Sequence, residues 1–304
     1  MATGATLADG HQLRTELDKA LAALGDRVQV NADGYDVAVT ADQGALWFGP
    51  RPAVGGQPVG LQWDPDGVPL SALLDRIVAA ETLAKRLGTV TNPTSRIKRK
   101  PPVAVAAVVR PSPLAMLEKP GSGVTPGAEC KVARAQMDIS QETALQDGHR
   151  FKQCDRLEFA ASAKRKGPYD VNRIHIDASY CVRVGYTRLD GKTISGQPGP
   201  NMTMCSDCPG GYSAGDERLI LLVSKAERNS PALNLTGLVE TCKTTRQVRI
   251  QDRSAVAFLE ALADNRLTRG GLGRVGVTDL WVESYRWTIL PKPVAFAENG
   301  RALP

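Results

Sequence analysis

Short apolar segments separated by turn signals fill the chain from Cys130 onward, and this repetition constrains the fold more than any other feature. Five segments alternate apolar and polar residues or are rich in β-branched ones: 130–137, 156–163, 171–187, 217–226 and 280–290. Turn sequences stand between several of them: DGH (147–149), KGPYD (166–170) and LDGK (189–192). Such spacing is typical of an antiparallel sandwich. We therefore expect a β-sandwich over residues 128–304, interrupted by one helix at 254–264.

The first 90 residues have a different pattern, in which two amphipathic helices enclose short extended runs. Apolar residues recur at helical spacing over 7–24 and again within 64–88. Gly25-Asp26 favours the end of the first helix. Three extended runs lie between the helices: 27–31, 35–40 and 44–49. Residues 1–90 therefore predict a small α/β layer, so we expect an α+β chain in which this layer precedes the antiparallel sandwich.

Residues 91–127 separate these two units. They are rich in Pro, Thr and Gly, and most of them show no hydrophobic period. One apolar, β-branched run lies among them at 103–109. We interpret the segment as a linker that contains one strand.

The charge pattern gives little sign of a polyanionic partner. The net charge is +6, with 38 basic and 32 acidic residues. Basic residues cluster at 96–100 and 163–167, but no aromatic residues interleave with them and no nucleic-acid motif accompanies them. We interpret both clusters as solvated segments and expect no nucleic-acid partner.

The sequence also predicts neither a membrane partner nor export. No apolar run approaches the roughly 18–20 residues of a membrane span. The first residues have neither the basic flank nor the apolar core of a signal peptide. These features favour the cytoplasm, where the six cysteines, all from residue 130 onward, would be reduced. In a secreted chain they could pair, with a connectivity that the sequence does not give.

Two stretches together resemble a known family. The first runs from YDVAVTADQGALWFG (35–49) to DPDGVPLSALLDRIVAAETLAKRL (64–87). It resembles the α/β segment that follows the protease domain in many bacterial caspase-like proteins. The second combines CVRVGYTRLDGKTISGQPG (181–199) with GYSAGDERLILLVS (211–224). It resembles the immunoglobulin-like domain at the C-terminus of such proteins.

This resemblance to peptidase C14, or metacaspase-like, proteins covers residues 17–90 and 150–290. It implies that the sandwich is immunoglobulin-like and that the chain is the non-catalytic accessory half of a caspase-like system. The family's catalytic His-Gly pair and Asp-Cys motif are not clearly present upstream of the accessory region. The implied role is recognition or regulation. The implied partner is a caspase-like protease, the chain's own protease half, or a small signal molecule.

The loop sequence NMTMCSDCPGGYSAGDE (201–217) permits three interpretations, of which the first is a zinc site. Cys205 and Cys208 have the Cys-x2-Cys spacing that supplies half of a tetrahedral site. No second such pair exists in the sequence. The single ligands that only the fold could bring to them are Cys181, Cys242, His149 and His175.

The second interpretation is cysteine catalysis. Asp207 directly precedes Cys208 and small residues follow, as in the caspase-like nucleophile loop. A nucleophilic thiol needs a base to activate it, and His175 is the nearest candidate, although no glycine follows it. A degenerate caspase-like cysteine peptidase, with Cys208 as nucleophile, is therefore the enzymatic alternative.

The third interpretation, which we favour, is a long loop that joins two sandwich strands. Loops of this length are often binding elements. The residues expected to carry binding are Cys205, Ser206, Asp207, Cys208, Gly210 and Tyr212. This predicts a binding module with no chemistry of its own and no cofactor, zinc being the alternative. A disulfide between the two loop cysteines, or from one of them to Cys242, is left open.

Overall fold

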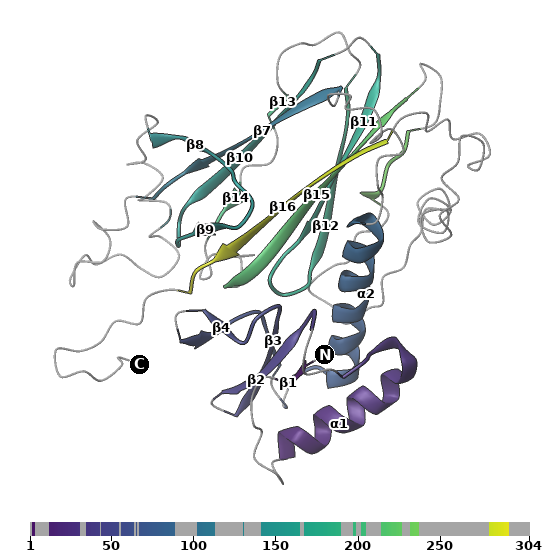
Figure 1. The fold of residues 1–304 in the computed structure, drawn as a ribbon, viewed down its shortest axis with the longest axis vertical. Helices are drawn as coiled ribbons and strands as arrows, with labels where there is room; N and C mark the ends of the chain where they lie inside the picture. Colours follow the sequence, from purple (N-terminus) through teal and green to yellow (C-terminus); the bar gives the residue numbers. More distant parts are fainter. Residues whose placement is uncertain are drawn as a thin grey trace, which may run out of the picture.

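The described part of the chain folds into two α-helices and mostly antiparallel strands, so the expected α+β class is confirmed (Figure 1). The computed structural model describes residues 2–3, 12–30, 35–42, 44–54, 56–63, 65, 67–88, 102–112, 130, 141–164, 167–189, 197–198, 202–204, 214–226, 232–236 and 280–291. Among these residues, neither helix is long and apolar enough to cross a membrane.

The N-terminal unit combines the two helices with a small sheet. Its elements are α1 (Gln12–Leu24), a 3-10 turn (Gly25–Arg27), α2 (Leu70–Gly88), a four-stranded sheet of β1 (Ala2–Thr3), β2 (Ala38–Asp42), β3 (Ala45–Gly49) and β6 (Leu61–Trp63), and a hairpin of β4 (Ala53–Val54) and β5 (Gln57–Pro58). Both predicted helices and the predicted strand at 44–49 are therefore confirmed, and residues 7–11 of the first helical pattern lie outside the described residues. The strand predicted at 35–40 begins three residues late, at Ala38.

The two helices form because each has one continuous apolar face. In α1 the buried residues are Leu13, Leu17, Ala20 and Leu24. In α2 they are Leu70, Leu73, Leu74, Ile77, Ala80, Ala84 and Leu87. The turn before α2 is fixed by the Trp63 indole, which donates from Nε1 to the carbonyl of Val68 at 2.8 Å. The apolar residues that recur at helical spacing in the sequence are thus the ones that each helix buries.

The strand predicted at 27–31 is wrong for the residues that the structure describes. Arg27 belongs to the 3-10 turn, and residues 28–30 form no strand. Val30 is 59% exposed, so the run does not bury the alternating apolar face that a strand of a half-buried sheet needs.

The second half contains two five-stranded sheets. We call β12 (Val182–Leu189), β11 (Tyr169–Ile176), β15 (Gly215–Lys225), β16 (Leu280–Ile289) and β9 (His149–Phe151), in that order, the central sheet. We call β13 (Gln197–Pro198), β10 (Arg156–Ala163), β7 (Val103–Arg110) and β8 (Thr143–Ala144), with β14 (Met202–Thr203) also paired to β10, the outer sheet. All their pairings are antiparallel except that of β16 with β9.

The central sheet is buried on both faces. Leu219 and Leu221 of β15 pack into one cluster with residues of the outer sheet, among them Leu157 and Phe159. Ile220 and Leu222, on the opposite face, belong to a cluster that includes both helices and the small sheet. Successive residues of a strand point to opposite faces, so β15 contributes to two cores at once. Figure 1 shows the result, with α2 standing beside the central sheet.

A segment after β15 completes the helix-facing core. Leu233 and Leu235 are almost fully buried in it. The amide of Asn172 holds both of them, donating to the carbonyl of Leu233 and accepting from the Leu235 amide, each at 2.9 Å. The Asp170 carboxylate accepts from the Leu233 amide at 3.0 Å. These polar groups on β11 are therefore structural.

The predicted units share one interior. The cluster around α2 contains residues of both the N-terminal unit and the central sheet, and the run at 103–109, expected in the linker, is an inner strand of the outer sheet. The predicted boundaries at 90 and 127, and the immunoglobulin-like topology of the sandwich, stay predictions. The helix expected at 254–264, the basic cluster at 96–100 and all of 130–137 beyond Cys130 lie outside the described residues.

Candidate functional site

The loop that we expected to bind a partner lies between β14 and β15. Its predicted binding residues, Cys205, Ser206, Asp207, Cys208, Gly210 and Tyr212, lie outside the described residues. The structure does describe Met204 before the loop and Ala214 after it, and each of these flanks is fixed by main-chain hydrogen bonds. The geometry of the site is therefore built from its two anchors.

The first anchor holds Met204 against the outer sheet. The Met204 side chain is fully buried, in the cluster between the two sheets. Its amide donates to the carbonyl of Asp155 at 2.8 Å, and its carbonyl accepts from the amide of Cys154. Cys154 is in turn disulfide-bonded to Cys130. The residue that precedes the loop is therefore fixed by both hydrogen bonds and apolar packing.

The second anchor holds Ala214 against the N-terminal unit. The carbonyl of Ala214 accepts a hydrogen bond from the amide of Gly60 at 2.8 Å. The next residue, Gly215, has φ +135°, and a Cβ there would lie 3.0 Å from the Cβ of Ala178 and 3.2 Å from the Gly60 nitrogen. Glycine is therefore required by both the backbone angle and the close approach.

Charged side chains surround this second anchor. Asp216 pairs with Arg51 of the N-terminal unit at 2.6 Å and accepts from the Thr288 hydroxyl at 2.5 Å. Arg218 pairs with Glu81 of α2 at 2.9 Å. These contacts join β15 to the small unit and to α2, so the end of the loop sits at the junction of all layers.

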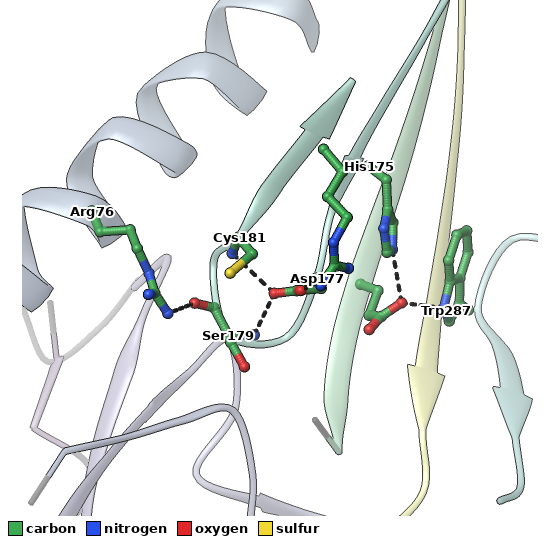
Figure 2. A network of polar contacts seen from close by, with 8 residues as sticks. Arg76, His175, Asp177, Ser179, Cys181 and Trp287 are labelled. Carbon is green, nitrogen blue, oxygen red and sulfur yellow. Dashed lines mark hydrogen bonds and ion pairs between the residues drawn. The ribbon is translucent and has the colours of Figure 1, made fainter. Parts of the chain in front are cut away.

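A buried polar cluster joins three neighbouring strands of the central sheet, with His175 on β11, Glu217 on β15 and Trp287 on β16 (Figure 2). The side chain of Glu217 is fully buried, and its Oε2 lies 2.9 Å from Nε2 of His175 and accepts from Nε1 of Trp287 at 3.1 Å. The imidazole and indole rings stack with centroids 5.7 Å apart. The second oxygen of Glu217 has no hydrogen-bond partner in the described part of the chain. Burial raises the pKa of Glu217 above its ordinary value, and the nearby His175 partly offsets this.

A tight turn between β11 and β12 completes the site. One Asp177 oxygen accepts from the amides of Ser179 and Cys181, both at 2.9 Å, and the other pairs with Arg183 at 3.0 Å. Arg76 of α2 donates to the carbonyl of Ser179 (Figure 2). The carboxylate therefore organises the turn, and α2 holds it in place.

The sequence predicted one strand over 171–187, and this turn divides it into two. The prediction failed because the segment contains no Gly or Pro between Asp177 and Cys181. Tyr180 supplies the left-handed residue instead, with φ +58°. The signal present in the sequence was Asp177 followed by small residues, because an aspartate side chain can bond the backbone two residues on and so start a turn.

The residues predicted as candidates for catalysis or metal binding do not come together in the described part of the structure. His175 is buried and its Nε2 faces Glu217, so this nitrogen is not aimed at solvent. Cys181, a candidate ligand in the zinc alternative, is disulfide-bonded and so has no thiolate to offer a metal ion. Cys208 and Cys242 lie outside the described residues, and the remaining candidate, His149, packs edge-on against Phe151. Within the described ranges no three His, Cys, Asp or Glu side chains are grouped to hold a metal.

A separate hollow of 310 Å³ opens in the N-terminal unit, and no sequence pattern predicted it. Its apolar wall comes from both helices and from Val28 and Val37. Its charged rim includes Asp36 and Lys85, which pair at 2.6 Å, and Glu81, which is already engaged by Arg218. The hollow has the size and lining to take a small amphipathic molecule.

Comparisons with protein-family models, with characterised proteins and with solved structures found no match to this chain. The resemblance to the accessory region of bacterial caspase-like proteins therefore stays a prediction.

Proposed function

We propose that this chain is a non-catalytic recognition module of a bacterial caspase-like protease system, and that it binds its protein partner through residues 205–213. The observation that carries the proposal is the double anchoring of that segment. Its start is clamped to the outer sheet at Met204, and its end is clamped to the N-terminal unit at Ala214. A loop held at both ends by different layers loses less conformational entropy when it binds.

The engagement of the nearby polar groups supports a role in binding rather than in catalysis. His175 faces Glu217, and Asp177 accepts two backbone amides and pairs with Arg183. A catalytic base must reach the proton that it removes, either directly or through one water. Groups committed to holding a turn and a core are suited to positioning the loop that follows them.

The proposal is tested by replacing residues 205–213 with a Gly-Ser linker of equal length in the otherwise complete chain. The probe is the purified protease domain of the caspase-like protein encoded nearest to this chain. We expect the wild-type chain to form a complex that sedimentation velocity detects, and the linker variant to lose at least tenfold in affinity. Val68→Ser is the matched control, because Val68 is exposed and lies in the N-terminal unit.

Unchanged binding by the linker variant would remove the loop from the proposal, and loss of binding by the Val68 control would show that the effect is not local. Peptide cleavage by the purified chain that disappears in Cys208→Ala would overturn the non-catalytic assignment in favour of a cysteine peptidase. A folded linker variant is verified by its circular dichroism spectrum before either comparison.

A further inference from the structure

We propose that this chain is built for an oxidising compartment, and that disulfides hold both anchors of the 205–213 loop. The first part stands on the cysteines alone, whereas the second part rests on the proposed function. Cys130 and Cys154 are disulfide-bonded across 24 residues of sequence. Cys181 is disulfide-bonded as well, to a partner outside the described residues. Each of the three cysteines in the described part of the chain is therefore oxidised.

These cysteines are buried rather than adventitiously close on the surface. Cys130, Cys154 and Cys181 are 5%, 1% and 4% exposed. A soluble reductant must reach a sulfur atom to attack it, so a buried disulfide resists reduction until the surrounding structure opens. Disulfides of this kind are rare in reducing compartments and common in oxidising ones. The cysteines thus favour an oxidising setting over the cytoplasm expected from the sequence.

Left-handed backbone angles lie at one bonded cysteine and directly before another. Among the described residues, two that are not glycine have a left-handed φ: Cys154 at +68° and Tyr180 at +58°. The first is itself a bonded cysteine, and the second directly precedes Cys181. Such angles are costly for residues with a Cβ and persist where the surrounding structure imposes them. A covalent bond at each turn supplies that constraint.

Each disulfide lies beside one anchor of the loop. The amide of Cys154 donates to the Met204 carbonyl, which is the first anchor. Cys181 closes the turn in which Ala178 meets Gly215, next to the second anchor. Opening either bond releases a turn that a flank of the loop packs against, so oxidation and loop presentation are coupled.

Formation of these disulfides requires an oxidant, and a thiol oxidoreductase in its disulfide form can serve as one. Each bond forms when two thiols lose two protons and two electrons, and the disulfide of a thiol oxidoreductase accepts them and becomes a dithiol. Any partner that the loop binds would then meet this chain in the same oxidising compartment.

The test begins with the full chain produced once in an oxidising compartment and once in a reducing cytoplasm. Each sample is denatured, its free thiols are blocked with N-ethylmaleimide, and the alkylated sites are mapped by mass spectrometry. From the oxidising source we expect Cys130 and Cys154 in one cross-linked peptide pair and Cys181 unmodified. Alkylation of Cys130, Cys154 and Cys181 in that sample would overturn the proposal.

The coupling to the loop is tested on the oxidised chain and on the Cys130→Ala/Cys154→Ala double variant. Loss of the bond is expected to lower the melting temperature by roughly 5–10 °C. Amide hydrogen exchange at Cys154 and Met204 should become at least tenfold faster. If the double variant does not fold, the wild-type chain reduced with a phosphine is measured instead. Unchanged exchange at both amides would overturn the coupling.

Failure of this inference is distinguishable from failure of the proposed function. If the mapped disulfides are present but reduction leaves binding of the protease domain unchanged, the coupling fails and the binding loop stands. If the linker variant of 205–213 binds as wild type, the binding loop fails, while the map of Cys130–Cys154 is unaffected.

Discussion

Three ion pairs within the N-terminal unit differ in exposure from three carboxylates of the central sheet and its turn. In the N-terminal unit the ion pairs Arg14–Asp18, Arg27–Asp75 and Lys85–Asp36 lie on the surface, with every side chain at least 42% exposed. In the sandwich, the carboxylates of Asp170, Asp177 and Glu217 are at most 4% exposed.

This difference indicates where each half is vulnerable. Exposed pairs contribute little, because water and salt screen them and two long side chains must be ordered. A buried carboxylate stabilises the fold only while its partners are present, and removing it leaves those partners unsatisfied. The N-terminal unit is therefore held mainly by apolar packing, whereas the turns of the sandwich depend on single polar residues.

The largest effect is expected at Asp177. The change Asp177→Ala removes the acceptor for the amides of Ser179 and Cys181 and the partner of Arg183. We expect it to lower the free energy of unfolding by about 3 kcal/mol. Urea denaturation measures the loss. The matched change Asp75→Ala breaks an exposed pair, and a comparable loss there would remove the contrast between the two halves.

A smaller effect is expected at Gly215, at the second anchor. Alanine there would adopt a φ of +135° and meet Ala178 at 3.0 Å. We expect Gly215→Ala to cost about 2 kcal/mol, from the backbone angle and the contact together. Gly44→Ala is the control in the N-terminal unit, because Gly44 has φ +80° but nothing within 4 Å of a Cβ. Gly44→Ala should lower the free energy of unfolding by about 1 kcal/mol. Equal losses in the two variants would show that the contact between residue 215 and Ala178 does not contribute.

The next prediction concerns pH and Glu217. Burial raises the folded pKa of this group above its ordinary value of 4.5. The folded state then holds the proton more tightly than the unfolded state, so the contribution of this group is present at low pH and is lost as the pH rises from about 4.5 through the folded pKa. His175, Asp177 and Trp287 are the groups that act on it.

The change Glu217→Gln isolates this contribution, because the amide has the same shape and does not titrate. The difference in unfolding free energy, wild type minus variant, should fall as the pH is raised from 4 to 7. Chemical denaturation at several pH values measures it, and the subtraction cancels the other carboxyls. A difference that is constant, or that grows with pH, contradicts the assignment.

The smallest effect is expected at the exposed pair of Lys85 and Asp36. We expect Lys85→Ala to change the unfolding free energy by less than about 0.5 kcal/mol. The remaining effect should shrink further in 1 M salt, where charges are screened over a few ångströms. A loss above about 1.5 kcal/mol would show that the rim of the nearby hollow has a structural role.

Periodicity in the sequence identified the elements that bury one continuous face. Both helices and the strands β3, β7, β10, β15 and β16 were found because their apolar spacing follows directly from what they cover. The run at 27–31 has the composition of a strand, but Val30 is 59% exposed. Whether such a run buries a face depends on tertiary packing, which leaves no local trace in the sequence.

The candidate site was less visible in the sequence than the fold. The sequence drew attention to the cysteine loop, but not to the Gly60–Ala214 hydrogen bond that fixes one end of it, because these residues are remote along the chain. Glu217 reads as an ordinary polar residue at the start of a strand, and only the pairing of β11 with β15 places it against His175. The burial of a single carboxylate depends on tertiary packing, which the spacing of residues along the sequence does not reveal.

The two-sided burial of the central sheet also has a consequence for how the protein is made. α1 and the small sheet are synthesised with α2 and share its core, but the buried central-sheet residues of the same cluster lie between Ile174 and Leu222. At about 5–20 residues per second, the part of the core that the central sheet covers waits on the order of ten seconds after Gly88. The nascent chain is therefore expected to be a client of holding chaperones, and rare codons between β7 and β11 should raise the fraction that aggregates.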